Sequence, residues 1–103
     1  MGRTEANTVA WILLAISFWD KSSVARAEIL HSADAIDHSV PLESELELAL
    51  GFLIRQGLIE EDGHSFSISD AGREMLEAAH GGSGNIFDVW KALEPRIALL
   101  GAA

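Results

Sequence analysis

Two histidines and an aspartate are spaced in a way that could hold a metal ion. His31, Asp34 and His38 lie at positions i, i+3 and i+7. A helix continuing through them would place all three on one face, with Glu28 beside them as a further ligand. The residues over 34–41 are more typical of a turn, which would separate these side chains. We therefore expect a solvated cluster here, with neither a metal nor a cofactor.

The other residues that could carry chemistry form no catalytic pattern. The chain has no Cys, which excludes thiol nucleophiles and thiolate metal sites. None of its serines stands in a nucleophile-elbow sequence, and the acids at 60–62 fall on an expected hairpin tip where no pocket is implied. The glycine-rich segment at 81–84 follows a helix and precedes no Lys, unlike a phosphate-binding loop. We expect a protein that is not an enzyme.

Charge and hydropathy narrow the class of partner. Seven Lys and Arg stand against sixteen Asp and Glu, which gives a formal net charge of -9 over 103 residues. Such a chain attracts basic partners and repels polyanions. The apolar run over 9–19 is far shorter than the roughly 20 residues that span a bilayer, and it makes a poor signal peptide. We expect a cytoplasmic protein that does not enter a membrane.

The spacing of apolar and capping residues predicts a mainly α chain with one small β-hairpin. A turn at Asp62-Gly63 separates the two expected strands, with Ile59 set against Phe66 and Ile68 as their apolar positions. Ser69 or Asp70 is expected to cap the helix after the hairpin, and Pro95 to kink or restart the last helix. The helices are expected from Val9 to about Phe18, from Val24 to about Ala33, from Pro41 to just before Gly57, from Asp70 to about Ala79 and from Asn85 toward Leu100.

The first and last of these helices are apolar over wide faces. A domain of this size has difficulty covering both, so we expect a homodimer that buries them. The expected contact residues are Trp11, Leu14, Phe18, Trp90 and Leu93. Packing of the two helices against each other within one chain is the alternative.

The order helix, helix, helix, hairpin, helix resembles a winged helix-turn-helix domain, with a three-helix core and an additional C-terminal helix. The specific part of the resemblance is the stretch 46–76, which contains Gly57-Leu58-Ile59 after a Leu-rich helix and Ser69-Asp70-Ala71-Gly72 after the hairpin. These features are similar to the small dimeric bacterial regulators of the PadR and MarR families. The resemblance implies a winged-helix domain over residues 1–80, a hinge at 81–84 and a C-terminal dimerisation helix over 85–103.

In those families the third helix enters the major groove of DNA and the hairpin, or wing, touches phosphates. Carried over to this chain, the resemblance implies a partner or nucleic-acid surface made of Glu43, Ser44, Glu47, Arg55, Glu60, Glu61, Asp62 and His64. The segment 41–62 holds six acids against Arg55 alone, a net charge of -5. DNA affinity comes largely from Lys and Arg that neutralise phosphates, so this segment departs from the pattern of a DNA reader.

Two hypotheses about function follow. The first is a non-enzymatic protein-interaction or regulatory module that offers this acidic surface to a basic protein partner. The alternative is a DNA-binding transcriptional regulator of the winged helix-turn-helix type. The negative charge of this surface argues against DNA binding, while the resemblance to winged-helix regulators argues for it.

Overall fold

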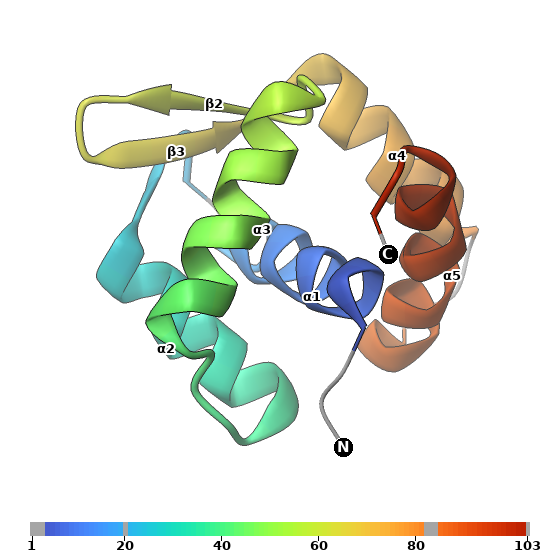
Figure 1. Ribbon diagram of the computed structural model, residues 1–103, viewed down its shortest axis with the longest axis horizontal. Helices are drawn as coiled ribbons and strands as arrows, with labels where there is room; N and C mark the ends of the chain where they lie inside the picture. The colour runs from blue at the N-terminus through green and yellow to red at the C-terminus, as the bar shows by residue number, and fades with distance from the viewer. Residues whose placement is uncertain (1–3, 20, 82–84, 103) are drawn as a thin grey trace.

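Figure 1 shows a computed structural model that describes residues 4–19, 21–81 and 85–102. Within these ranges the chain forms five helices and three short strands, so the protein is mainly α, as the sequence predicts. In chain order the elements are α1 (Glu5–Ser17), β1 (Val24–Ala25), α2 (Arg26–Asp37), α3 (Glu43–Arg55), β2 (Ile59–Asp62), β3 (Ser65–Ile68), α4 (Asp70–His80) and α5 (Ile86–Leu99). No helix among the described residues combines the length and the apolar character needed to cross a membrane.

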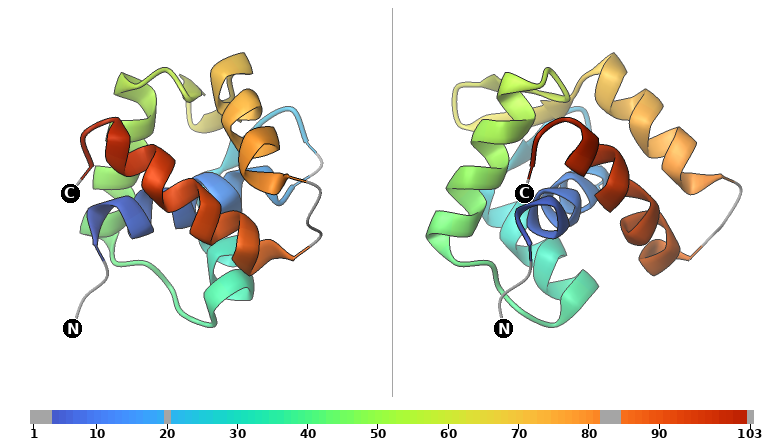
Figure 2. Two further views of the ribbon diagram at one scale, coloured as in Figure 1. Left: turned by 90° about the vertical axis from the view of Figure 1, so that its right-hand side faces the viewer. Right: turned by 45° about the vertical axis from the view of Figure 1, so that its right-hand side comes forward.

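Helix α1 lies at the centre of the molecule and packs against α2, α3 and α5 (Figures 1 and 2). It begins at Glu5, because the Thr4 hydroxyl accepts a hydrogen bond from the Asn7 amide at 3.1 Å and caps the helix. Its apolar residues run nearly all round the helix and are buried on every side. A helix of this kind has to be covered all round, and the neighbouring helices provide that cover.

The hairpin forms as predicted, and a third strand extends it. The sheet order is β1-β3-β2, all antiparallel, and Ile59 pairs with Ile68. The third strand, β1, was not predicted, since the sequence favours a helix from Val24. Val24 instead pairs with Phe66 and is buried. Two residues are too few to show the alternation that identifies a strand in a sequence.

Helix α2 is displaced relative to its prediction. It begins at Arg26 and continues to Asp37, so the predicted end near Ala33 is wrong, and the predicted turn over 34–41 is restricted to 38–41. The stripe of buried residues Ile29, Ala33 and Ile36 continues past the predicted end and keeps the helix on the core. The helix stops at His38, whose left-handed backbone (φ 55°) directs its N–H to the Asp34 carbonyl at 2.6 Å.

A close approach of two backbones fixes the hairpin against α4. After α3, Gly57 takes a left-handed conformation (φ 71°) that turns the chain into β2. The carbonyl of Leu58 then accepts the Ser69 amide at 3.1 Å. A Cβ on Gly72, in the first turn of α4, would lie 2.1 Å from that same carbonyl oxygen. Of the two predicted caps, Ser69 is the N-cap of α4, since its Oγ accepts the Gly72 amide at 3.1 Å.

Helix α5 packs on α1 and α4 (Figure 2). It neither ends nor restarts at Pro95, which lies inside the helix on its exposed side. A proline has no N–H, so one carbonyl of the preceding turn lacks its helical hydrogen bond. Because this side of the helix is exposed, water can bind that carbonyl instead. Of the predicted hinge at 81–84, Gly81 is the left-handed C-cap of α4 (φ 50°), and 82–84 lie outside the described residues.

Candidate functional site

The predicted partner surface on α3 faces solvent. Glu43, Ser44, Glu47 and Arg55 are all exposed, on the side of the helix opposite its buried stripe. The helical period places Glu43 and Glu47 in one row and Ser44 and Arg55 in the next. We use the name acidic surface for these four side chains together with Glu60, Glu61, Asp62 and His64 of the hairpin.

Two large apolar side chains lie on the same exposed side of α3, and the sequence reasoning missed them. Leu48 is 44% exposed and Ile54 is 37% exposed. Gly51 lies between them on the helix and contributes no side chain. The sequence does indicate that Leu48 and Ile54 are exposed, because both lie outside the apolar stripe of the helix. The buried residues of that stripe are Leu46, Ala49, Leu50 and Leu53. Leu42, the N-cap residue of α3, is a further exposed apolar side chain, at 66%.

The acids of the hairpin lie on an edge strand and point to two faces of the sheet. Glu60, Glu61 and Asp62 of β2 are all exposed. Glu60 and Asp62 pair with Ser67 and Ser65, and successive residues of a strand alternate, so these two acids share one face. Glu61 pairs with Phe66 on the other face. The hairpin therefore presents negative charge on both faces, and the exposed His64 lies in the turn beyond.

Basic residues near the acidic surface already have partners within the protein. Arg26 at the start of α2 forms an ion pair with Glu47. The same guanidinium lies 6.0 Å from the centre of the Phe66 ring. Lys21 pairs with Glu28 at 2.5 Å and lies 5.9 Å from the centre of the Trp19 ring.

Glu28 itself closes a small network at the start of α2. One carboxylate oxygen accepts the Ala25 amide at 3.0 Å, and the other binds the Lys21 ammonium. These two interactions, the Ala25 hydrogen bond first, hold the pKa of the Glu28 carboxyl below its usual value. The Trp19 indole N–H donates to the Glu28 carbonyl at 3.1 Å. The network fixes the chain between α1 and α2 to the second helix.

The predicted metal candidates are not gathered into a site. His31 and Asp34 are exposed on α2, and His38 is exposed at its left-handed C-cap. The His31 ring lies 6.1 Å from the Trp19 ring. Although the helix continues further than predicted, no group of three or more His, Cys, Asp or Glu capable of holding a metal occurs in the described part of the chain.

Four of the five predicted dimer contacts are buried inside one chain, and Phe18 alone among them is exposed, at 54%. Trp11, Leu14, Trp90 and Leu93 lie in the contact between α1 and α5, which is the packing that the sequence offered as the alternative. The Trp11 and Trp90 rings stack with centroids 6.0 Å apart and planes 17° apart. Their indole N–H groups donate to the Ala33 and Asn7 carbonyls, each at 3.1 Å.

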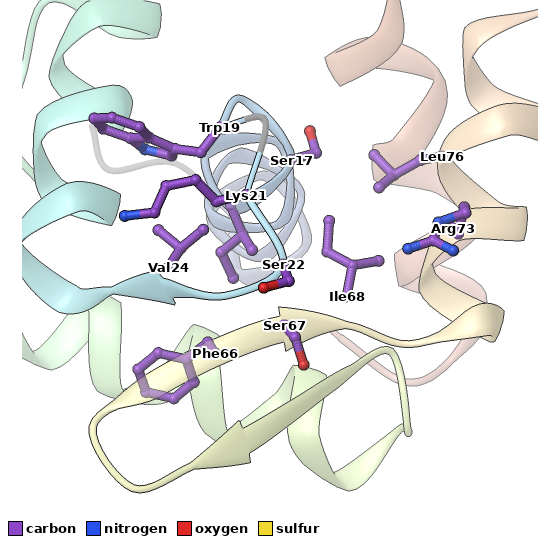
Figure 3. A pocket seen from close by; sticks show the side chains of 11 residues that line it. Ser17, Trp19, Lys21, Ser22, Val24, Phe66, Ser67, Ile68, Arg73 and Leu76 are labelled. Atoms are coloured by element: carbon purple, nitrogen blue, oxygen red, sulfur yellow. The ribbon is translucent and has the colours of Figure 1, made fainter.

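A cleft of about 410 Å³ is lined by side chains that do not belong to the acidic surface. It lies between the end of α1, the strands β1 and β3, and α4 (Figure 3). Lys21 and Arg73 are its charged lining residues, and Ile16, Val24 and Leu76 are among its apolar ones. No sequence pattern indicates this cleft, because its walls come from segments far apart in the chain.

Comparison of the chain with protein-family models, with curated proteins and with solved structures finds no match.

Proposed function

We propose that this chain is a non-enzymatic winged-helix module that binds a basic protein partner through its acidic surface. The order of the elements supports a winged-helix assignment: a helix, then two helices joined by a short connection, then a hairpin and a further helix. The small antiparallel sheet beside α3 is consistent with a wing. A shared fold does not by itself fix a function, so the proposal depends on the chemistry of the surface.

The observation that carries the proposal is the excess of exposed carboxylates on α3 and β2. Five carboxylates of the acidic surface stand against the single guanidinium of Arg55. Arg26 of the neighbouring helix α2 already pairs with Glu47. Each unpaired carboxylate raises the cost of approaching phosphates and favours Lys and Arg of a protein partner.

The two exposed apolar residues of α3 indicate what else the partner must offer. Interfaces gain most of their affinity from apolar anchors that become buried, with charged groups around them setting specificity. Leu48 and Ile54 provide such anchors, and Gly51 between them leaves room for a partner side chain to approach the helix closely. A basic amphipathic helix, with apolar residues at i, i+3, i+4 and i+7, fits this combination.

A synthetic basic amphipathic peptide tests the proposal directly. Its binding is followed by fluorescence anisotropy at low and at physiological salt. We expect saturable binding that weakens with salt and weakens further when the two outward acids of β2 are reversed in Glu60→Lys/Asp62→Lys. The matched control is Glu74→Lys/Glu77→Lys, which changes the net charge equally at exposed positions of α4. Equal loss in both variants, or no binding by the unmodified chain, would overturn the proposal.

The homodimer is a second part of the proposal. Phe18 is the exposed member of the predicted contact set, so a dimer has to use it together with other exposed residues. Light scattering over a range of concentrations measures the association, and Phe18→Asp should weaken it. A chain that stays monomeric at high concentration would end this part of the proposal without affecting the first.

The alternative function is a DNA-binding transcriptional regulator of the same fold. The element order supports it equally, and Arg55 and Arg73 are exposed cations that could reach phosphates. Two or three phosphate contacts give little affinity at physiological salt, because affinity scales with the number of contacts. A mobility-shift measurement on DNA decides between the two functions.

A further inference from the structure

The cleft between α1, β1, β3 and α4 is lined by apolar side chains and by two cations, Lys21 and Arg73. Its volume of about 410 Å³ lies in the range of small-molecule sites. Ile68 of β3 and Leu76 of α4 are half-buried and supply its accessible apolar surface, whereas Ile16 and Val24 line it but are almost fully buried. Figure 3 shows Val24, Ile68 and Leu76 around one hollow, with Arg73 at one end and Trp19 at the other.

Arg73 is the unusual feature of this cleft. The side chain is exposed on α4 and reaches toward the hollow beside Ile68 (Figure 3). Among the residues that the structure describes, its guanidinium pairs with no carboxylate, although acids outnumber bases sixteen to seven in the chain. None of the described residues lining the cleft is acidic, and Asp20 lies outside the described residues.

The second cation of the cleft does not compete for the same ligand. The Lys21 ammonium is turned toward α2, where it pairs with Glu28 at 2.5 Å (Figure 3). Its aliphatic stem covers the cleft wall while its charge is neutralised. Among the described residues that line the cleft, Arg73 therefore carries the one charge that is not neutralised by a neighbour.

These features select a class of ligand. A planar guanidinium binds a carboxylate through two parallel hydrogen bonds, which a point charge cannot do. One unpaired positive charge in a chain of net charge -9 suits a monoanion and disfavours polyanions. The apolar lining suits an aliphatic body, and Ser22 at the rim is a hydroxyl donor with no partner among the described side chains.

We propose that this cleft binds a small amphiphilic monocarboxylate, with the carboxylate on Arg73 and the aliphatic chain over Ile68 and Leu76. The site is separate from the acidic surface, so the inference stands or falls independently of the proposed partner. Binding would be carried by burial of the aliphatic chain and oriented by the guanidinium.

Octanoate is the probe, titrated into the full chain by calorimetry and by tryptophan fluorescence. Trp19 lines the cleft and is half-buried, whereas Trp11 and Trp90 are buried in the contact between α1 and α5, so Trp19 is the expected reporter. We expect saturable binding with a Kd that is roughly millimolar or tighter. Acetate, which lacks the chain, and octan-1-ol, which lacks the carboxylate, should each bind much more weakly.

Three variants separate the site from general effects of charge. Arg73→Gln should weaken octanoate binding by about tenfold or more, since a charge-assisted contact is lost. Arg73→Lys should restore part of the affinity, and Lys91→Gln, which removes an exposed cation of α5 outside the cleft, should change nothing. Circular dichroism checks that each variant is folded. The proposal is overturned if octanoate does not saturate, if octan-1-ol binds equally well, or if Arg73→Gln binds octanoate as tightly as the unmodified chain.

Discussion

The Arg26 guanidinium pairs with the Glu47 carboxylate, and this ion pair joins the start of α2 to the exposed side of α3. The same guanidinium lies over the Phe66 ring of β3, so one side chain connects both helices to the sheet. A cation held in this way keeps little attraction for phosphate, because its field is offset by Glu47 at short range. The acidic surface therefore stays negative even beside its nearest base.

The stacked pair Trp11 and Trp90 is expected to hold the two ends of the chain together. Trp90→Ala removes the stack and the hydrogen bond to Asn7, and it leaves a cavity between α1 and α5. We predict a loss of about 3–5 kcal/mol in the free energy of unfolding, measured by urea denaturation. Phe87→Ala is the control on the same helix, at a side chain that is 50% exposed. It should cost less than about 1 kcal/mol, and equal losses in the two variants would refute the buried contact.

Helix α4 approaches the backbone of Leu58 so closely that position 72 has no room for a side chain. In Gly72→Ala the new Cβ meets the Leu58 carbonyl oxygen, a backbone atom that cannot move aside cheaply. We predict a destabilisation of about 1–3 kcal/mol or more.

Gly51→Ala provides the matched comparison inside another helix. Its Cβ would approach only the flexible end of the Arg55 side chain, at 3.1 Å. The substitution should stabilise the protein by roughly 0.5–1 kcal/mol, since alanine favours the helix. Thermal unfolding of both variants measures the contrast, and a Gly72→Ala variant as stable as Gly51→Ala would show that the two backbones are not in contact.

The Glu28 network predicts a pH-dependent contribution to stability. The Ala25 amide and the Lys21 ammonium lower the pKa of Glu28 in the folded state. A carboxyl whose pKa is lower when folded stabilises the protein above its unfolded pKa, and this stability is lost as the pH falls through the folded pKa. Glu28→Gln should therefore lower the Tm at neutral pH, and the difference from the unmodified chain should vanish in acid.

Glu77→Gln is the control for that pH profile. It makes the same change in net charge at an exposed position of α4. Its Tm should follow the unmodified chain at every pH. If the two variants gave the same profile, the stabilisation would come from overall charge and not from the contacts of Glu28.

The sequence predicted those parts of the fold that depend on short-range patterns. The hairpin follows from residues close to a tight turn, and the cap at Ser69 follows from its own side chain. The end of α2 was missed because a left-handed His38, and not a glycine, terminates that helix. β1 was missed because Val24 becomes a strand residue only by pairing with Phe66, far along the chain.

The exposed side chains of α3 could likewise be predicted from the sequence, whereas the contacts between distant segments could not. The exposure of Glu43 and Glu47 could be predicted from helical periodicity, and so could that of Leu48, had the same rule been applied to apolar residues. The burial of Trp90 against Trp11 could not, because periodicity shows which face of a helix is apolar and not what covers it. The cleft beside Arg73 depends on four segments meeting in space, and no local pattern encodes that meeting.

The claim that the acidic surface excludes DNA is tested most directly by a mobility-shift titration of the full chain on mixed genomic fragments at low salt. We predict no shift by the unmodified chain at concentrations where non-specific DNA binders, with Kd of about 1–100 μM, retard the fragments. The folded Glu60→Lys/Asp62→Lys variant should retard them more than the unmodified chain does. Tight retardation by the unmodified chain would contradict the account and favour the DNA-binding regulator.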